Sequence, residues 1–558
     1  MRVQRSIMRK HQFHICQFLL RILLLSVGFL SMPCFAADSY YFFVQFTDKN
    51  NTTFSLDRPE EFLSAKAISR RMEQGIAYDS TDLPVNPDYL TQLTNHGLKI
   101  HSSSKWMNGA TVLLQDSSLM AQIRLLPFVK TTEYTGIKTE SISPAPRKIN
   151  KLIEEYDYGT AATQIGRLNG AALHNAGYTG KDIIIGVIDA GFQQADNNIA
   201  FDSLHLQNRL LGTVSIIDST IDVFREDAHG ANVLSIMAAN IPQQYFGTAP
   251  HASYWLIQTE YVPTEYKVEV DFLVRGLEYA DSVGVDVVNI SLGYFEFDDP
   301  VMNFTYDDMN GKFSRASRAA TLATQKGIII CNSAGNEGNS SWKYIASPSD
   351  AEGILSVGAV DVNDTIAYFS SYGPSADGRT KPEVCAIGLN TALINRNGNP
   401  ATGNGTSYSS PVIAGLMACY LQYCKEKIPH TYDVEQILTH IVQSSDRYNH
   451  PDERYGYGIP DFQEAMNSIL TDVIHNRKKD TSHSVHYIPG SGDLKIMVNP
   501  FTTGRSCQVN IFTANGNLRF AHKFYDSATI HLNNYAAGIY MVQVISEDKI
   551  SLTKIMIH

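Results

Sequence analysis

Four short apolar runs in the middle of the chain constrain its fold more than any other feature. Stretches with helical patterning separate them, and they cover residues 183–188, 254–257, 285–290 and 328–331. Nearly continuous apolar strands that alternate with helices indicate a parallel sheet with helices on both faces. We therefore predict an α/β domain over residues 149–475, with its functional residues beyond the carboxyl ends of the strands.

A smaller segment, residues 38–148, precedes this domain. It opens with a strand-like aromatic run over 40–46 and continues with an Ala- and Arg-rich helical stretch over 62–74. It ends in a Pro- and Ser-rich stretch at 141–148, which is a linker by composition. This order of patterns predicts a small α+β unit ahead of the main domain.

A third segment, residues 487–558, follows a polar linker at 476–486. Its apolar residues alternate with polar ones over 507–512 and 539–544, and turn residues stand at 515–516. Several short runs with a period of two predict a small all-β sandwich.

The first residues, 1–37, have the three parts of a secretory signal. A basic head is followed by an apolar stretch that Arg21 interrupts, and small residues at 36–37 mark the expected cleavage site. A retained membrane anchor is disfavoured because the apolar run after Arg21 is too short. A lipid anchor on Cys34 is disfavoured because Pro33 stands where that signal needs a small residue.

Composition excludes some functions and leaves others open. The 558 residues carry a formal net charge of −11, so neither nucleic acid nor an anionic membrane surface is an expected partner. Of the 7 cysteines, Cys16 and Cys34 lie in the signal, and the others show no CxxC or zinc-like spacing. No disulfide framework is predicted, and no metal site is assigned.

Two residues of the middle segment fit the base of a hydrolytic site and the group that orients it. Asp189 follows the run at 183–188, so its carboxylate is held at the carboxyl end of a strand. His229 stands where small residues lead into an apolar helical pattern, so its imidazole would project from a helix start. Taken singly, Asp189 also fits a turn residue, and His229 a surface or capping residue.

Asn336 and Ser407 fit the remaining groups of such a site. Asn336 follows the run at 328–331 and could donate its amide to a developing oxyanion. Ser407 precedes a helical stretch over 409–423, with Pro411 expected in the first turn, so the Ser407 N–H would be a second donor. The alternatives are an αL turn asparagine and a helix-capping serine.

The four residues follow one another in the order Asp, His, Asn, Ser along one predicted sheet. Asp, His, Ser is one of three orders known for serine hydrolases with these groups. Over roughly residues 160–470 the chain resembles the subtilisin-like serine proteases, or subtilases. The matching motifs are Ile188-Asp189-Ala190-Gly191, His229-Gly230, Ala334-Gly335-Asn336-Glu337-Gly338 and Gly405-Thr406-Ser407-Tyr408-Ser409-Ser410-Pro411.

This resemblance implies a subtilisin-like parallel sheet and a secreted serine endopeptidase that works through an acyl-enzyme. In such an enzyme Ser407 attacks the substrate, His229 shuttles the proton and Asp189 orients His229. Asn336 stabilises the oxyanion, and Ser291-Leu292-Gly293 belongs to the strand that pairs with extended protein or peptide substrates. No cofactor is required; many subtilases bind calcium, but the sequence assigns no site for it. We expect a monomer.

Both flanking segments also resemble parts of secreted subtilases. Residues 38–148 resemble the pro-region, which helps the catalytic domain fold and blocks its cleft until it is cut; a permanent accessory domain is the alternative. Residues 487–558 resemble the sorting domain of type IX secretion; a β-sandwich binding module is the alternative. The matching features are Val498-Asn499-Pro500-Phe501, the hairpin at 514–518, Gly538-Ile539-Tyr540 and Lys554.

The resemblance thus predicts a precursor that is exported across both membranes and released or held at the cell surface. Two other classes of function fit the sequence less well. An inactive subtilase-like scaffold would be expected to lack one of the four groups, and none is lacking. An α/β-hydrolase needs G-x-S-x-G, but Ser409 occupies the second glycine position. Glu260, Glu265 and Glu269 are interpreted as a solvated helix face; a helix that lines the cleft is the alternative.

Overall fold

The structure is a computed structural model. It describes residues 39–138, 157–428, 432–476, 483–488, 492–498, 506–513, 517–525, 527–532, 534–546 and 549–557. The predicted signal peptide, the linker at 141–148 and most of the linker at 476–486 lie outside these residues.

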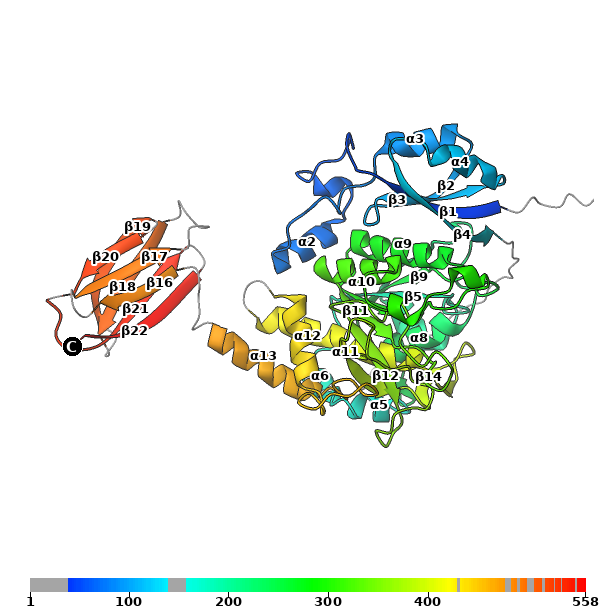
Figure 1. Cartoon of the computed structure of the whole chain (residues 1–558). Helices are drawn as coiled ribbons and strands as arrows, with labels where there is room; N and C mark the ends of the chain where they lie inside the picture. Colours follow the sequence, from blue (N-terminus) through cyan, green and yellow to red (C-terminus); the bar gives the residue numbers. More distant parts are fainter. Residues whose placement is uncertain are drawn as a thin grey trace, which may run out of the picture.

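A seven-stranded parallel sheet lies at the centre of the middle domain (Figure 1). In spatial order its strands are β13 (Val384–Ile387), β12 (Leu355–Val360), β11 (Ile329–Ser333), β10 (Val287–Ile290), β5 (Ile184–Asp189), β9 (Ser253–Gln258) and β6 (Leu210–Ser215). Four of these are the predicted apolar runs, so the α/β prediction is confirmed. β5 lies inside the sheet, with β9 and β6 on one side of it and the later strands β10 to β13 on the other. The strand order therefore reverses between β5 and β10. Ligands of open parallel sheets bind at such a switch point.

Helices cover both faces of the sheet, because side chains alternate along each strand. Ile185 and Val187 of β5 face a core layer that includes α8 (His229–Ala238) and α11 (Thr406–Lys427). Ile188 faces the opposite layer, with α9 (Val268–Val283) and α10 (Arg315–Gln325). The smaller elements of this domain are α5 (Ala162–Gly166), α6 (Ala171–Asn175), α7 (Asp202–Leu206), α12 (Val434–Gln443), α13 (Phe462–Asn476), β7 (Asn240–Ile241), β8 (Tyr245–Phe246), β14 (Thr391–Ile394) and β15 (Pro400–Gly403).

The helix that carries Ser407 begins earlier than predicted. α11 starts at Thr406, so Pro411 lies inside the helix, and its predicted place in the first turn was wrong. A proline inside a helix cannot donate to the carbonyl oxygen four residues earlier, which here belongs to Ser407. The hydroxyl of Ser291 donates to that oxygen instead, at 3.0 Å. The side chain of Ser291, which directly follows β10, thus replaces the missing helical hydrogen bond.

The N-terminal unit is an antiparallel sheet with helices, as the α+β prediction requires. Its strands lie in the order β2 (Lys99–Ser104), β3 (Gly109–Leu114), β1 (Ser39–Phe46) and β4 (Val129–Lys138). Its helices are α2 (Ala65–Gln74), α3 (Pro87–Asn95) and α4 (Met120–Ile123). α2 begins three residues later than predicted, because the Ser64 side chain accepts the N–H of Ala67 and caps the helix.

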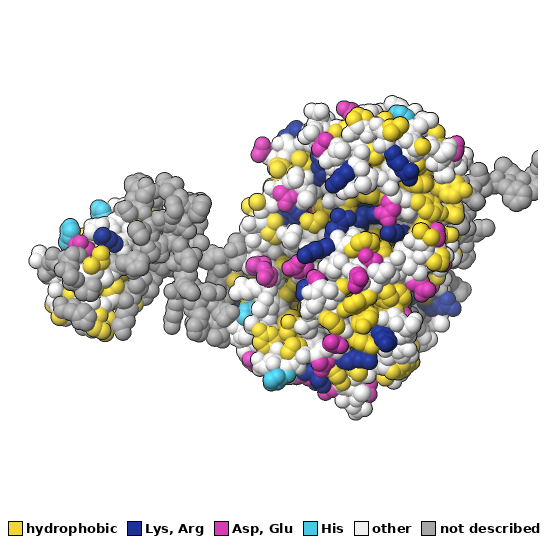
Figure 2. Space-filling view, in the orientation of Figure 1, with side chains coloured by type: hydrophobic (Ala, Val, Ile, Leu, Met, Phe, Trp, Pro, Cys, Tyr) yellow, Lys and Arg dark blue, Asp and Glu magenta, His cyan; other side chains and the backbone are white. Residues whose placement is uncertain are grey.

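Charged side chains join this unit to the outer helices of the middle domain. Asp281 of α9 is fully buried, and its carboxylate lies 2.6 Å from Arg70, 2.8 Å from Arg71 and 2.9 Å from Lys105. On α10, Arg315 bridges Glu133 of the N-terminal unit and Asp271 of the middle domain. Figure 2 shows Lys and Arg side chains gathered across the middle of this face, where the two units meet.

The C-terminal unit is a small sandwich of two antiparallel sheets, which confirms the all-β prediction. One sheet holds β16 (His483–Ile488), β17 (Asp493–Val498) and β20 (Ser527–His531). The other holds β19 (Leu518–Tyr525), β18 (Ser506–Thr513), β21 (Gly538–Ser546) and β22 (Lys549–Ile557). Apolar side chains of both sheets form one core. The predicted turn at 515–516 lies outside the described residues, although β18 and β19, which flank it, do pair.

Candidate active site

Asp189 and His229 form a hydrogen-bonded pair at the carboxyl edge of the sheet. Asp189 ends β5 and is fully buried, and its Oδ1 accepts hydrogen bonds from His229 Nδ1 at 2.7 Å and from the N–H of Ala190 at 2.8 Å. A carboxylate acceptor requires the proton on Nδ1, so Nε2 of the neutral ring is free to accept a proton. The pair therefore has the arrangement of a general base and the group that orients it.

The surroundings of His229 favour its protonated form. Burial opposes the charge on the ring, but the carboxylate of Asp189 outweighs this effect and raises the pKa of His229 above its ordinary value of 6.5. Tyr408, which follows Ser407 on α11, lies beside the imidazole with the two ring centroids 5.7 Å apart. The helix that carries Ser407 thus reaches the ring of His229 directly.

Ser407 lies in the first turn of α11, and its side chain is almost buried, at 9% exposed. Its hydroxyl donates to the carbonyl oxygen of Ser291 at 3.4 Å, and within the described part of the chain it forms no hydrogen bond with His229. The hydrogen bond between a nucleophile and its general base is often long or poorly aligned until substrate is bound. Gly405, not Ser407, is the N-cap of α11, so the interpretation of Ser407 as a helix cap is wrong.

Asn336 lies exposed in the loop after β11, and its amide is held in one orientation. Its Oδ1 accepts the N–H of Thr406 at 2.9 Å and the hydroxyl of Thr406 at 3.2 Å. This leaves Nδ2 without an acceptor among the residues the structure describes, beside the start of α11. Thr406 also accepts the N–H of Gly335, so one side chain fixes the loop and the amide. Sequence reasoning missed this role of Thr406, although Thr406 stands inside the serine motif.

The segment Ser291-Leu292-Gly293 follows β10 beside these groups. Ser291 is tied to α11 by the two hydrogen bonds with Ser407, and Tyr294 exchanges backbone hydrogen bonds with Ser347. Gly293 between them is exposed, and neither of its backbone groups is paired within the described residues. An extended peptide laid along this segment would find a free backbone donor and acceptor.

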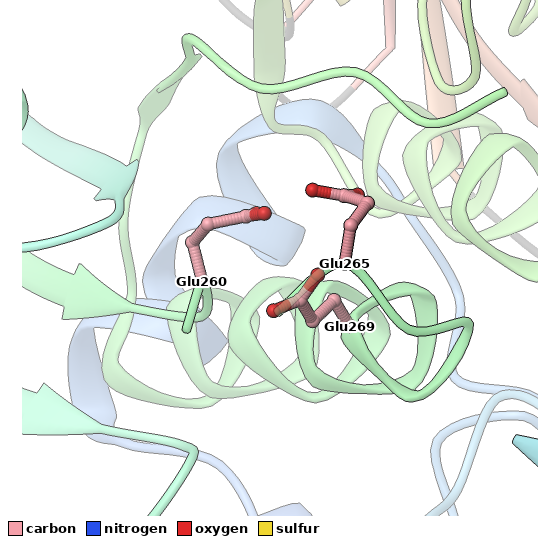
Figure 3. A group of neighbouring side chains, drawn as sticks. All are labelled: Glu260, Glu265 and Glu269. Carbon is pink, nitrogen blue, oxygen red and sulfur yellow. The ribbon is translucent and has the colours of Figure 1, made fainter. Parts of the chain in front are cut away.

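The prediction that Glu260, Glu265 and Glu269 form a solvated helix face was wrong. Only Glu269 lies on α9; Glu260 follows β9 and Glu265 lies in the loop between, so the three carboxylates converge (Figure 3). One oxygen of each lies within 4.8 Å of the others, and Glu269 is only 1% exposed. Burial raises the pKa of Glu260 to about 7, and burial together with the charge of Glu260 raises that of Glu265 to about 9. These are the described residues that could hold a metal ion.

The five cysteines beyond the signal are Cys331, Cys385, Cys419, Cys424 and Cys507. All five are buried, and none of them forms a disulfide bond, in agreement with the prediction. They lie in apolar surroundings and behave as small hydrophobic residues.

Three family descriptions match successive parts of the chain. The subtilase family matches residues 180–458, and a Bacteroidota propeptide domain of the same peptidase family matches residues 41–151. A secretion system C-terminal sorting domain matches residues 488–558. The sorting domain marks the chain for export, to the cell surface or the medium. In the part of the chain that the structure describes, no helix is both long and apolar enough to cross a membrane.

Two curated proteins and one solved structure are similar to parts of this chain. Subtilisin NAT of Bacillus subtilis subsp. natto is 27% identical over 376 residues, which cover 67% of this chain and 84% of that protein. Serine protease AprX of Bacillus subtilis (strain 168) is 26% identical over 358 residues, covering 57% and 73%. Among solved structures, MycP1 with its N-terminal propeptide removed has a TM-score of 0.44 at 21% identity, covering 55% of this chain and 96% of that chain.

The subtilase match spans half of the chain and contains all four residues of the candidate site. Together with the propeptide and the sorting domain, it confirms the resemblance that the motifs indicated. This chain belongs to the subtilase family of serine endopeptidases.

Proposed function

We propose that this exported protease cleaves peptide bonds with the triad Asp189, His229 and Ser407, through an acyl-enzyme. The observation that carries the proposal is the hydrogen bond from His229 Nδ1 to the buried carboxylate of Asp189 at 2.7 Å. It leaves Nε2 free to act as a base, beside the helix start that presents Ser407.

In the proposed reaction, Nε2 of His229 takes the proton of the Ser407 hydroxyl while Oγ attacks the scissile carbonyl carbon. The resulting oxyanion accepts hydrogen bonds from Nδ2 of Asn336 and from the N–H of Ser407, one of the unpaired donors at the start of α11. His229 then gives its proton to the leaving amine, and the C–N bond breaks. Water, deprotonated by His229, hydrolyses the ester that remains on Ser407.

Protein or peptide substrates would bind in an extended form along Ser291-Leu292-Gly293, where the backbone of Gly293 is free. The reaction requires no cofactor, and we propose that the enzyme acts as a monomer. We also propose a precursor with a signal peptide at 1–37, a pro-region at 38–148, the catalytic domain at 149–475, a linker at 476–486 and the sorting domain at 487–558. Cutting after the pro-region would open the cleft.

The test is a comparison of Ser407→Ala with Ser409→Ala. Ser409 is buried one residue beyond Tyr408, and its hydroxyl only donates back to the carbonyl oxygen of Thr406, so it is a matched control. Ser407→Ala is expected to lower peptide hydrolysis by ~10⁶-fold, the loss known for the nucleophile of subtilisin. It should also leave the precursor uncut, whereas Ser409→Ala should process itself. Hydrolysis or processing that continues in Ser407→Ala would overturn the proposal.

A further inference from the structure

The three glutamates beside the cleft bring their carboxyl groups together without a cation of the described chain among them, and one of the three, Glu269, is buried. Glu260, Glu265 and Glu269 come from the end of β9, the following loop and the first turn of α9, and their carboxylates point toward one another (Figure 3). None of the three forms an ion pair with a Lys, Arg or His of the described chain. Lys267, which directly precedes α9, is paired with Glu133 at 2.6 Å.

Glu269 provides an observation that the clustering alone does not. Its side chain is 1% exposed, and its Oε1 accepts the N–H of Tyr261 at 2.9 Å. Its Oε2 is buried and has no hydrogen-bond partner. Leaving a carboxylate oxygen buried and unpaired is costly. Asp189 and Asp271 also have such an oxygen, but the other oxygen of each is paired with His229 or Arg315, whereas no ion pair of the described chain reaches Glu269. Oε2 of Glu269 therefore marks a place for a positively charged ligand.

The donor set identifies the class of that ligand. Three carboxylates are hard oxygen donors, and no cysteine or histidine is among them. Three oxygens within 4.8 Å of one another lie no farther than about 2.8 Å from one common point, which is within a few tenths of an ångström of the Ca²⁺–O distances of about 2.3–2.6 Å. Glu269 also lines a cavity of about 250 Å³ at the boundary with the pro-region, which has room for the waters that complete a calcium shell.

We propose that Glu260, Glu265 and Glu269 bind a calcium ion beside the substrate cleft. The ion would join the end of β9 to the first turn of α9 and fix the loop between them. Glu260 also accepts the hydroxyl of Tyr294 at 3.1 Å, and Tyr294 directly follows the segment Ser291-Leu292-Gly293. Calcium would therefore stiffen the wall of the cleft along which substrate is laid.

The experiment uses the full precursor with Ser407→Ala, stripped with a chelator, so that neither autolysis nor catalysis affects the readout. Calcium chloride is titrated by calorimetry, and the melting temperature is followed with and without calcium. Glu265→Gln and Glu269→Gln each remove one ligand charge. Glu296→Gln makes the same change on an exposed residue of the neighbouring loop and is the control.

Binding with a stoichiometry of one that also raises the melting temperature is expected in the parent and in Glu296→Gln. In Glu265→Gln and Glu269→Gln the Kd should rise by at least about tenfold, and the calcium-dependent rise in melting temperature should shrink accordingly. A parent that takes up no calcium would overturn the proposal, as would an unchanged Kd in both glutamate variants. The glutamine variants could instead be more stable than the parent in the absence of calcium and bind calcium as tightly as the parent does. That result would overturn the calcium site and show that the three glutamates share protons.

Discussion

At the residue scale, the site depends on orientation as much as on the identity of its groups. In the proposed reaction the amide nitrogen of Asn336 must face the oxyanion, and the two hydrogen bonds that Thr406 donates to Oδ1 fix the position of the amide oxygen. The Asp189 carboxylate acts in the same way on His229, whose free nitrogen is set by the bond to Nδ1.

Replacing Asn336 with Ala is expected to lower kcat by about 10²–10³-fold and to change KM little, because the amide acts mainly on the oxyanion of the transition state. This is the loss known for the corresponding amide donor in subtilisin. Steady-state kinetics on a peptide substrate measure it, with Asn363→Ala, an exposed and distant asparagine, as the control. A change in KM alone would show that Asn336 binds substrate without stabilising the oxyanion.

The pH dependence follows from the raised pKa of His229. The free base must be neutral to accept a proton, so kcat/KM should rise with pH through a pKa above 6.5 and be lost below it. Asp189→Asn removes the carboxylate that raises this pKa, so the acid limb of the profile should move to lower pH. The maximum rate should fall by about 10⁴-fold, as in trypsin. An acid limb that stays in place would show that another group controls it.

At the element scale, α9 connects the pro-region and the cleft. Its outer side receives Arg70, Arg71 and Lys105 of the pro-region on Asp281, while its first turn carries Glu269. Burial opposes the charge on Asp281, but the three cations outweigh it and hold the pKa of this carboxyl far below its usual range. A carboxyl group whose pKa is lowered by folding stabilises the fold at pH values above its ordinary pKa of 3.8. This stabilisation is lost only as the pH falls toward the pKa of the folded state. This network therefore persists in mild acid.

Asp281→Asn is expected to lower the free energy of unfolding of the precursor by about 3–5 kcal/mol, because it leaves buried cations without their partner. Urea unfolding of Ser407→Ala precursors measures the change. Asp88→Asn, an exposed residue of α3, is the control. A loss no larger than that of the control would mean that the ion pairs do not hold the two units together.

The elements themselves were largely predictable from sequence, and the exceptions have physical reasons. β5, β9, β10 and β11 are largely buried on both faces and therefore read as apolar runs, which identifies these four strands without tertiary information. The edge strand β6 is half exposed and was not predicted. The position of Pro411 was wrong because Ser291, distant in sequence, supplies the hydrogen bond that allows a proline inside α11. The three glutamates were wrongly predicted to lie on one solvated helix. They come from the end of β9, the following loop and α9, and a local sequence pattern cannot show that these segments meet.

At the scale of the whole molecule, the chain combines a propeptide domain, a subtilase domain and a secretion sorting domain. The sorting domain forms its own core and the propeptide domain another, so each is a folding unit with its own apolar interior. All four residues of the candidate site lie in the middle unit, between residues 180 and 458.

Deletion of residues 488–558 is therefore expected to stop export and to leave the catalytic unit intact. Cell fractionation should find the truncated protein in the periplasm, and the purified truncated enzyme should match the full-length enzyme in kcat/KM. The control is the full-length protein, which should appear at the cell surface or in the medium. Normal export of the truncated chain, with weaker substrate binding, would assign this domain to substrate recognition instead.

The central claim is that Ser407 is the nucleophile, and labelling with a fluorophosphonate tests it most directly. The reagent forms a stable bond only with a serine that an adjacent base activates. Peptide mapping of the secreted enzyme by mass spectrometry should place one adduct on Ser407, and denatured enzyme or Ser407→Ala should carry none. An adduct on another residue, or equal labelling of Ser407→Ala, would contradict the account.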